Sequence, residues 1–498
     1  MTTDYIDVLI VGAGLSGIGA ACQLQARCPG TTYRVLEARE RMGGTWDLFR
    51  YPGVRSDSDM HTLGYNFKPW TDGKAIADGP SILSYIREAA EEHGIEDRIR
   101  YRHKAVSASW DSARARWFVE IETPEGPKTI GCRWLHMCTG YYRYDRGYTP
   151  DFEGIDAFEG EIIHPQFWPE DYDYSGKKVV VIGSGATAIT LVPAMTDKAA
   201  SVTMLQRSPS YVVSLPARDR LANALRRFLP AKLAYGLTRW KNVIRQLYTY
   251  SLIRRFPGRT KARLKTLLRE ELGADFDLDT HFSPRYDPWD QRLCLVPDSD
   301  LFKALRGGGA HVVTDEIERF TANGIALVSG QTLDADLVVT ATGLELVYGG
   351  GMTLHVDGRQ VNINDEIVYR NAMLSGVPNL TNVFGYVNAS WTLRADLTSE
   401  YMCKMIAHLD RGSYAEVRPV PSGAIDRQDY ITFSSSYIQR SIDQFPKQGS
   451  EAPWLITQNY ARDVTLMRFG KIDDPALAFK RAGTDAREQE PVPVGAAE

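Results

Sequence analysis

The sequence predicts an α/β fold with two dinucleotide-binding domains, the second nested in the first, and an inserted helical subdomain. Three patterns predict this fold. Two glycine-rich turns each follow a short apolar strand and open a helix, later strand patterns return to the first unit, and a basic helical segment interrupts the second unit. The 498 residues allow more than one core, because a single core usually stops growing at about 250 to 300 residues.

The first βαβ unit is expected to bind a dinucleotide. A strand at 5–11, a helix at 16–27 and a strand at 33–37 surround the turn Gly12-Ala-Gly14-Leu-Ser16-Gly17. These glycines allow a tight turn and a close approach of a pyrophosphate to the helix N-terminus. Glu37 ends the second strand, about 20 residues further along, where a carboxylate accepts hydrogen bonds from ribose hydroxyls. The unit is therefore Rossmann-like.

The second unit repeats this arrangement with a different strand end. A strand at 178–182, a helix at 187–195 and a strand at 202–206 surround the turn Gly183-Ser184-Gly185-Ala186-Thr187-Ala188. Alanine is tolerated at the third glycine position, where the helix packs on the strand. The second strand is followed by Arg207-Ser208 instead of an acid, and a guanidinium can hold a 2′-phosphate that a carboxylate would repel. The sequence therefore favours NADPH over NADH.

The remaining patterns divide the chain into parts. Runs at 117–122 and 129–137 are expected to be accessory strands of the first domain, and strands at 336–340 and 382–386 with a helix at 395–409 are expected to complete it. The predicted parts are the first domain (1–145), a linker (146–176), the second domain (177–215 and 273–330), the basic helical insertion (216–272), the return to the first domain with substrate-pocket lining (331–485) and a flexible tail (486–498).

Two longer motifs carry a family resemblance. The linker holds Phe158-Glu-Gly160-Glu-Ile-Ile-His164-Pro-Gln-Phe-Trp168-Pro169, and the first domain holds Gly43-Gly44-Thr45-Trp46-Asp47 followed by Tyr51-Pro-Gly-Val-Arg55-Ser56-Asp57. Both motifs match the fingerprints of the type I Baeyer–Villiger monooxygenases, which the chain resembles over nearly its whole length. In detail it looks closest to the group of mycobacterial monooxygenases that activate thioamide prodrugs.

The resemblance implies FAD in the first domain, NADPH in the second, and conversion of ketones to esters or lactones through a C4a-peroxyflavin, with sulfoxidation as a further reaction. It implies that Arg292 is the catalytic arginine and that Asp57 orients it, while His164 couples domain motion. One departure is Gln291, where many relatives have a lysine, so that Arg207 is left as the main determinant for NADPH. The implied cofactor-binding residues of the second motif are Gly44, Thr45, Trp46, Asp47, Arg55, Ser56 and Asp57.

The chemistry of arginine fits this role independently. An anionic oxygen intermediate needs a dry site with a fixed cation, and arginine stays charged at any physiological pH. Its planar fork can hold an oxygen anion on one edge while a carboxylate such as Asp57 holds the other. Without the resemblance, Arg292 would read as a structural salt-bridge partner.

The insertion at 216–272 is strongly basic. It holds fifteen Lys or Arg against three acids, with apolar residues at helical spacing, and therefore predicts amphipathic helices. One interpretation is a helical subdomain of the NADPH domain whose basic face is solvated or attracts the anionic cofactor. The other is peripheral attachment to the inner face of a membrane.

Composition excludes several other classes. The net charge of −4 gives no general basic field for nucleic acid, no 18-residue apolar window suggests a membrane span, and the six cysteines form no Cys-x-x-Cys pair. No histidine constellation predicts a metal. We therefore expect a cytoplasmic enzyme that takes a ketone or sulfide and O2 as partners, in an oligomeric state open to homo-oligomers. The alternatives are a flavin-containing S- or N-oxidising monooxygenase and a non-catalytic flavoprotein, whereas a disulfide reductase lacks its cysteine pair.

Overall fold

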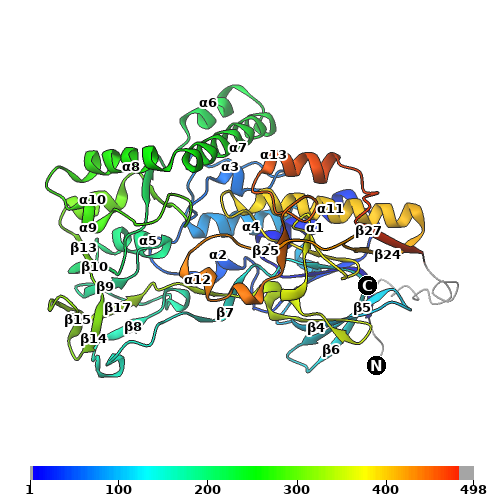
Figure 1. Cartoon of the computed structure of the whole chain (residues 1–498), viewed down its shortest axis with the longest axis horizontal. Coiled ribbons are helices and arrows are strands. Elements are labelled where there is room, and N and C mark those ends of the chain that lie inside the picture. Colours follow the sequence, from blue (N-terminus) through cyan, green and yellow to red (C-terminus); the bar gives the residue numbers. More distant parts are fainter. Residues whose placement is uncertain (1–3, 482–498) are drawn as a thin grey trace.

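The computed structural model describes residues 4–481, so the tail predicted at 486–498 lies outside the described residues. Two sheets lie side by side, and helices cover one edge of the molecule (Figure 1). The βαβ opening of the first domain is as expected, because β1 (Asp4–Val11), α1 (Leu15–Arg27) and β2 (Tyr33–Glu37) follow one another directly. In the second domain, β9 (Lys178–Ile182), α5 (Ala186–Met195) and β10 (Ser201–Gln206) repeat this order.

The first sheet has nine strands in the order β20-β19-β4-β5-β6-β1-β2-β3, with β23 pairing to β6. Strands β6, β1, β2 and β3 are parallel neighbours, whereas β4, β5 and the first half of β6 form an antiparallel meander. The helices α1, α4 and α11 pack on one face of this sheet over a continuous apolar core. The further bounds are β3 Ile99–Tyr101, β4 Lys104–Asp111, β5 Arg116–Glu122, β6 Lys128–Met137, β19 Thr353–Val356, β20 Arg359–Gln360, β23 Leu380–Asn382, α4 Gly79–Glu92 and α11 Trp391–Gly412.

The second sheet has five parallel strands in the order β13-β10-β9-β17-β8. Its edge strand β8 comes from the linker, and β17 comes after a three-stranded antiparallel unit, β14-β15-β16. After β17 the chain returns to the first sheet through β19, β20 and β23, so the second domain is nested in the first. The bounds are β8 Glu161–Ile163, β13 Ala310–Thr314, β14 Ile317–Thr321, β15 Gly324–Leu327, β16 Thr332–Asp334, β17 Leu337–Thr340 and α10 Asp300–Arg306.

Short strands and helices complete the two domains and the region between them. Strands β7 and β18 pair between the domains, β11 pairs with β12, and β24 pairs with β27 at the end of the described chain. The bounds are β7 Tyr142–Gly147, β11 Val212–Leu215, β12 Cys294–Pro297, β18 Leu344–Leu346, β21 Val368–Tyr369, β22 Met373–Leu374, β24 Tyr414–Pro419, β25 Arg427–Asp429, β26 Lys447–Gly449, β27 Leu477–Arg481, α2 Thr45–Leu48, α3 Met60–Leu63, α9 Leu278–His281, α12 Ser436–Gln439 and α13 Tyr460–Asp463, which continues into a π-helical turn at Val464–Phe469.

One predicted strand is wrong in its position. Strand β23 occupies 380–382, so the strand expected at 382–386 ends where it was predicted to begin. It ends there because its partner β6 ends at Met137, and the hydrogen bond from the Val383 N–H to the Met137 carbonyl is the last between the two strands. The following residues stay buried without a strand partner. The helix expected at 395–409 is longer at both ends, as α11 begins at Trp391.

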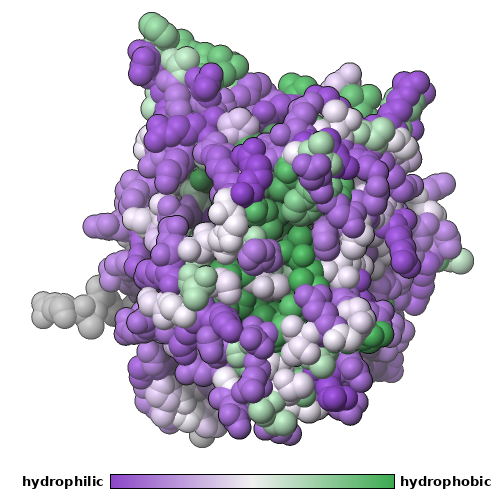
Figure 2. Space-filling view, turned by 90° about the vertical axis from the view of Figure 1, so that its left-hand side faces the viewer, coloured by the Kyte–Doolittle hydropathy of each residue, from purple (hydrophilic) through white to green (hydrophobic). Residues whose placement is uncertain are grey.

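The basic insertion folds as three helices, but they do not form one subdomain. Helices α6 (Arg220–Phe228) and α7 (Ala231–Arg255) run along the upper edge of the molecule, and hydrophobic residues gather on the projection at the top of Figure 2. Helix α7 packs on the first domain, where the Tyr235 hydroxyl donates to the Tyr65 carbonyl at 3.0 Å. Helix α8 (Pro257–Leu272) instead packs into the core of the second domain through Leu268 and Leu272.

Buried polar contacts fix α7 on the first domain. Arg239 is only 5% exposed, and it donates to the Gly64 carbonyl at 2.7 Å and pairs with Asp396 of α11 at 3.2 Å. The interpretation of the basic face as solvated is therefore wrong for this arginine. An amphipathic pattern does not reveal a buried ion pair whose partner lies far away in the sequence. Within residues 4–481, no helix is both long enough and apolar enough to cross a membrane.

Candidate active site

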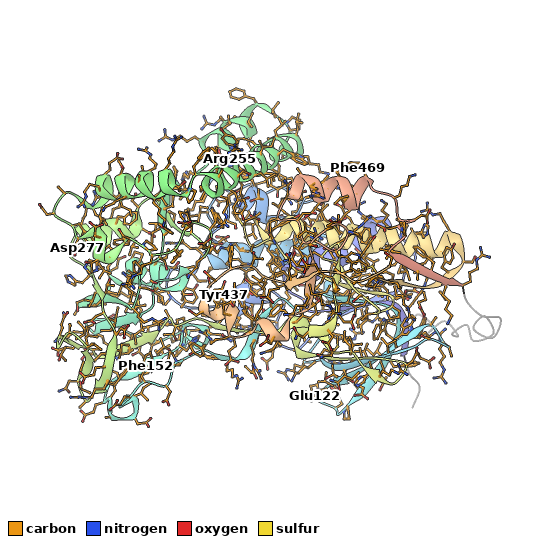
Figure 3. The ribbon with its side chains drawn as sticks, viewed as in Figure 1. Glu122, Phe152, Arg255, Asp277, Tyr437 and Phe469 are labelled. Atoms are coloured by element: carbon orange, nitrogen blue, oxygen red, sulfur yellow. The ribbon has the colours of Figure 1, made fainter. Side chains whose placement is uncertain are left out.

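A cavity of about 950 Å³ lies between the two sheets. It is large enough for a sizeable organic ligand, since small-molecule sites usually measure about 300 to 1,000 Å³. Tyr437 of α12 lies in the same central region of the molecule (Figure 3). The cavity brings together predicted residues from both domains, namely Gly12, Gly14, Ser16, Glu37, Gly44, Thr45, Trp46, Arg55, Ser56, Asp57, Ala186, Thr187 and Arg292.

The first glycine turn has the shape that a pyrophosphate needs. Gly12 has a φ of +103°, and a Cβ at this position would lie 2.5 Å from the Cys138 carbonyl oxygen. Gly17 is also required, because its Cβ would lie 1.8 Å from the Gly12 carbonyl oxygen. Helix α1 begins directly after Gly14, and no side chain caps its N-terminus. Its first N–H groups are therefore available to an anion in the cavity.

Glu37 borders the cavity and is held by the backbone. Its two carboxylate oxygens accept hydrogen bonds from the N–H groups of Ala13 and Arg39, each at 2.9 Å. Burial raises the pKa of Glu37, and these two hydrogen bonds oppose the rise. The carboxylate is thereby fixed beside the turn, where a ribose hydroxyl of a bound dinucleotide would lie.

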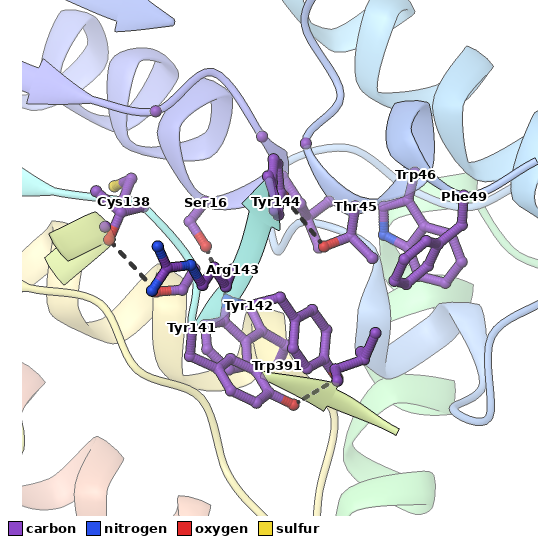
Figure 4. A pocket seen from close by; sticks show the side chains of 18 of the residues that line it. Ser16, Thr45, Trp46, Phe49, Cys138, Tyr141, Tyr142, Arg143, Tyr144 and Trp391 are labelled. Carbon is purple, nitrogen blue, oxygen red and sulfur yellow. Dashed lines mark hydrogen bonds between the residues drawn. The ribbon is translucent and has the colours of Figure 1, made fainter. Parts of the chain in front are cut away.

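Only some residues of the motif at 43–57 line the cavity. The Gly43 N–H donates to the Ala13 carbonyl at 2.9 Å, and Thr45 Oγ1 lies 3.4 Å from the Tyr144 hydroxyl (Figure 4). The side chain of Asp47 is fully buried outside the cavity. It pairs with the guanidinium of Arg50 at 2.8 Å and with those of Arg39, Arg41 and Arg87. In this structure Asp47 therefore holds the loop in place and does not face the cavity.

Arg55 and Ser56 also have structural partners. The guanidinium of Arg55 pairs with Asp300 at the start of α10, so a first-domain arginine is bound to a second-domain carboxylate. The Ser56 hydroxyl accepts from the Ser58 N–H at 2.9 Å. Arg55 thus joins the domains at the rim of the cavity.

Arg292 and Asp57 form the central ion pair of the cavity. Arg292 Nε lies 2.9 Å from Asp57 Oδ2, and a terminal nitrogen donates to Oδ1 at 3.2 Å. The two side chains keep 34% and 31% of their surface accessible, because they face the cavity. The Asp57 carboxylate raises the pKa of Arg292, and desolvation opposes this rise. Arg292 therefore presents a permanent, oriented positive charge to the cavity.

Aromatic side chains surround this pair, and two of them, Tyr141 and Tyr142, were not predicted from the sequence. The Tyr141 and Tyr142 hydroxyls lie 2.8 Å apart, and both rings line the cavity (Figure 4). Tyr141 stacks on Trp391 with ring centres 5.1 Å apart, and Trp391 Nε1 donates to the Ser16 hydroxyl at 2.8 Å. Burial raises the pKa of both tyrosines, so they remain neutral hydrogen-bond donors. Their position directly after the carboxyl end of β6 is the signal that could have identified them.

The aromatic residues Trp289, Tyr386, Trp391 and Trp454 differ in whether they line the cavity. Tyr386 and Trp391 line the cavity, whereas Trp289 and Trp454 are not among its lining residues. Trp454 packs in the core against Tyr369, with ring centres 5.7 Å apart.

The second glycine turn opens toward the same cavity from the other domain. Gly183 has a φ of +140°, and a Cβ there would lie 2.4 Å from the Ala341 carbonyl oxygen. Gly12 packs on the Cys138 carbonyl in the same way. Helix α5 begins after Gly185 without a side-chain cap, Ala188 is buried against the sheet, and Thr187 of its first turn lines the cavity. The first turn of this helix is therefore also available to an anion.

The strand end after β10 carries the predicted phosphate-binding residues. Ser184 Oγ donates to the Ser208 carbonyl at 2.9 Å, which joins the turn to the strand end. Arg207 is exposed and has no carboxylate within 4 Å among residues 4–481. It lies outside the cavity lining, at the open carboxyl end of the second sheet. Its charge is therefore available to an anionic ligand.

The linker histidine, His164, connects the two chain segments that run between the sheets, the linker and the segment after β17. His164 Nδ1 accepts from the Gln166 N–H at 3.2 Å, and Nε2 lies 3.1 Å from the Gly343 carbonyl oxygen. Because a carbonyl only accepts, Nε2 carries the proton and the ring is neutral. Burial lowers the pKa of His164, which agrees with this state. His164 lines no part of the cavity and joins the outgoing linker to the returning chain.

No group of three or more His, Cys, Asp or Glu side chains is arranged to hold a metal ion in the part of the chain that the structure describes. The six cysteines are unpaired thiols, and five of them are buried. The polar groups that the lining does offer include the guanidinium of Arg292, the carboxylates of Glu37 and Asp57, and the hydroxyls of Tyr141 and Tyr142.

Comparison with known proteins identifies similar chains. A family model described as flavin-binding monooxygenase-like matches residues 71–248, and a model described as an NAD(P)-binding Rossmann-like domain matches residues 10–72. The FAD-containing monooxygenase EthA of Mycobacterium tuberculosis is 51% identical over 495 residues, which cover 99% of this chain and 100% of that protein. The probable FAD-binding monooxygenase AlmA of an Acinetobacter species is 46% identical over 490 residues, covering 98% of each.

Solved structures share the fold at lower identity. A steroid monooxygenase bound to NADP matches with a TM-score of 0.74 and 22% identity, covering 96% of this chain and 100% of that one. Cyclohexanone monooxygenase from Rhodococcus sp. Phi1, bound to NADP+, matches with a TM-score of 0.75 and 19% identity, covering 97% and 100%. The arrangement of two dinucleotide-binding domains is common to all of them.

Proposed function

The chain belongs to the flavin-binding monooxygenases and is an FAD- and NADPH-dependent enzyme of the Baeyer–Villiger type, and from this premise we propose that it inserts one oxygen atom into ketones to give esters or lactones. The observation that carries the proposal is the Arg292–Asp57 ion pair, which faces the same cavity as both glycine turns. The balanced reaction consumes ketone, O2, NADPH and one proton, and it yields ester, water and NADP+.

The two cofactors have matching sites. The Gly12 turn, the α1 N-terminus and Glu37 would hold the pyrophosphate and ribose of FAD, since the tight packing of Gly12 on the Cys138 carbonyl leaves room only for glycine and the N-terminus of α1 has no side-chain cap. The Gly183 turn, Ser208 and the unpaired Arg207 would hold NADPH. When bound, the two cofactors would supply electrons from NADPH, by way of FAD, to O2, so that one oxygen atom can enter the substrate and the other leaves as water.

Arg292 would stabilise the negative charge that develops on oxygen during transfer. A preorganised cation at a developing oxyanion is typically worth about 3 to 4 kcal/mol, and Asp57 fixes the orientation of the guanidinium before the reaction begins. The partly buried rings of Tyr141, Tyr142 and Trp391 limit access of water to this position. The neutral hydroxyls of the two tyrosines can donate hydrogen bonds to the carbonyl oxygen of a ketone.

The arrangement also supports oxidation of sulfur. A fixed cation assists transfer of oxygen to a sulfide or thioamide as well as to a ketone, and the relative EthA shares half of its residues with this chain. An enzyme that oxidises only sulfur or nitrogen is the alternative function. Incubation of the yellow holoenzyme with NADPH and a panel of ketones, sulfides and amines, with products identified by mass, distinguishes them. Sulfoxides or N-oxides without any ester would contradict the proposal.

The remaining partners are predictions from the sequence. A small-molecule ketone or sulfide and O2 are the expected reactants, and the enzyme is expected to work in the cytoplasm. Peripheral contact of residues 216–272 with the inner face of a membrane, and assembly into a homo-oligomer, stay predictions at this point.

A further inference from the structure

Helix α7 carries an apolar stripe on the side that faces solvent. Leu233, Leu237, Trp240, Ile244 and Tyr248 follow one another at intervals of three or four residues, which places them on one face of a helix. All five are exposed, and Ile244 and Tyr248 keep 61% and 65% of their surface accessible. A surface helix of a soluble protein normally presents polar residues on this side.

The buried side of α7 shows that this orientation is fixed. Ala234, Tyr235, Thr238, Arg239 and Asn242 are buried against the first domain, where Asn242 Nδ2 donates to Asp59 Oδ1 at 2.9 Å. At 3.6 residues per turn, this set lies on the face opposite to the apolar stripe. The helix therefore cannot turn its apolar stripe inward without breaking buried hydrogen bonds.

The apolar surface extends beyond α7 on both sides. On α6, Leu221 and Phe228 are seven residues apart and share a face, and Phe228 is 83% exposed. On the first domain, α13 contacts α7 through the rings of Tyr460 and Trp240, 5.6 Å apart. Phe469, at the end of the π-helical turn after α13, lies on the same upper edge of the molecule (Figure 3). We call these exposed residues of α6, α7 and Phe469 the apolar face.

Basic side chains flank the apolar face without acidic partners. Arg227, Lys232 and Arg245 are exposed and have no carboxylate within 4 Å in the described chain. Two of the three acids of the insertion have partners of their own, since Asp219 caps α6 and pairs with Lys241, and Glu271 accepts from Ser299. The third, Glu270, lies on α8, which packs on the second domain. The surroundings of the apolar face are therefore positively charged.

We propose that the apolar face docks on a lipid bilayer that contains anionic lipids, with the aromatic and aliphatic side chains in the headgroup region. A helix that presents large apolar residues between Lys and Arg side chains is typical of proteins that lie on a membrane surface, and Trp and Tyr prefer that interface. Anionic lipid headgroups complement the flanking arginines and lysine.

A second copy of the chain fits this surface less well. A symmetric dimer brings the same patch of two molecules together, so the unpaired Arg227, Lys232 and Arg245 of one copy would lie near those of the other. Like charges across an interface are unfavourable, and no acidic residue of the face offsets them. The charge pattern therefore favours the bilayer.

Co-sedimentation of the holoenzyme with vesicles tests the proposal. Vesicles of phosphatidylcholine with phosphatidylglycerol should bind the enzyme at low salt, whereas pure phosphatidylcholine vesicles should bind it weakly, and salt should reduce binding because it screens the charges. The double variant Ile244→Asp with Tyr248→Asp should lower the partition coefficient at least about tenfold. Val328→Asp changes an equally exposed apolar residue outside the apolar face and should bind like the wild type.

Two further measurements separate the outcomes. Arg227→Glu with Arg245→Glu should also weaken binding to anionic vesicles, while NADPH-dependent turnover of a water-soluble ketone should stay unchanged in all variants. No binding of the wild type at low salt overturns the proposal, and so does undiminished binding of the Ile244→Asp and Tyr248→Asp variant. A dimer in size-exclusion chromatography that this variant abolishes, without vesicle binding by the wild type, would assign the face to a second copy instead.

Discussion

The guanidinium of Arg292 holds both carboxylate oxygens of Asp57, at 2.9 and 3.2 Å, across a separation of 235 residues in the sequence. The two residues come from different domains, so the ion pair exists only when both domains surround the cavity. The edge of the guanidinium that Asp57 leaves free is the edge that can meet an oxygen anion.

Replacement of this arginine tests the proposed mechanism. Arg292→Ala should fold, bind FAD and be reduced by NADPH, because these steps do not involve the charge of Arg292. Ester formation should fall by about 10² to 10³, the usual effect of removing one oxyanion-stabilising group. NADPH oxidation should then yield hydrogen peroxide, measured as oxygen released by catalase. Near wild-type ester formation would leave Arg292 as a salt-bridge partner only.

The tyrosine pair should influence the reaction without titrating. Tyr142→Phe removes one of two hydroxyls 2.8 Å apart, and kcat/KM should fall about three- to tenfold, the value of one neutral hydrogen bond. Burial raises the pKa of Tyr142 well above its usual 10, so the hydroxyl stays protonated at lower pH. The wild-type pH–rate profile should therefore show no tyrosine limb below pH of about 10. A wild-type limb that disappears in Tyr142→Phe would contradict this assignment.

Arg207 should determine the choice of nicotinamide cofactor. Wild-type enzyme should prefer NADPH to NADH by at least about tenfold in kcat/KM, about 1.4 kcal/mol, and Arg207→Ala should erode this ratio mainly through the KM for NADPH. Arg306→Ala is a matched control, because Arg306 is exposed in the same domain but precedes β13, at the amino end of the parallel sheet, whereas Arg207 follows β10 at its carboxyl end. Full discrimination in Arg207→Ala would mean that another residue holds the phosphate.

Gly12 should be essential for FAD retention. Gly12→Ala places a Cβ 2.5 Å from the Cys138 carbonyl oxygen, so the turn has to open and the pyrophosphate contact is lost. The purified variant should contain far less flavin per chain, measured by the flavin absorbance at about 450 nm relative to the protein absorbance. Gly30→Ala has a similar φ of +94° but open space around the new Cβ, and it should retain flavin at a cost of about 1 kcal/mol.

The buried Asp396 should make stability depend on pH. Burial raises its pKa to about 7, although Arg239 opposes the rise. The folded state therefore binds this proton more tightly than the unfolded state, and the contribution to stability is complete below a pH of about 4 and is lost as pH rises through about 7. Asp396→Asn cannot titrate, and its Tm should change less between pH of about 5 and 8, by a few degrees. Asp426→Asn, at an exposed site, should follow the wild type.

The sequence was sufficient for features that depend on local patterns. The two glycine turns, the strands around them and the helical character of the insertion follow from spacing and periodicity. The Arg292–Asp57 pair was anticipated through the family resemblance and not through spacing. The burial of Asp47 among four arginines, the Arg55–Asp300 pair and the Tyr141–Tyr142 contact all depend on tertiary neighbours. Residue type and periodicity carry no information about such partners, because they lie far away in the sequence.

The division of the basic insertion between the two domains has a consequence for hinge motion. Helices α6 and α7 are fastened to the first domain, where Asn223 Nδ2 donates to the Gly73 carbonyl at 3.0 Å, while α8 lies in the core of the second domain. A rotation of the second sheet against the first would change the angle between α7 and α8, whose junction lies at Phe256 and Pro257. The apolar face would keep its position on the first domain while the nicotinamide-binding domain rotates. The cavity could therefore change shape without moving the surface that is proposed to contact the bilayer.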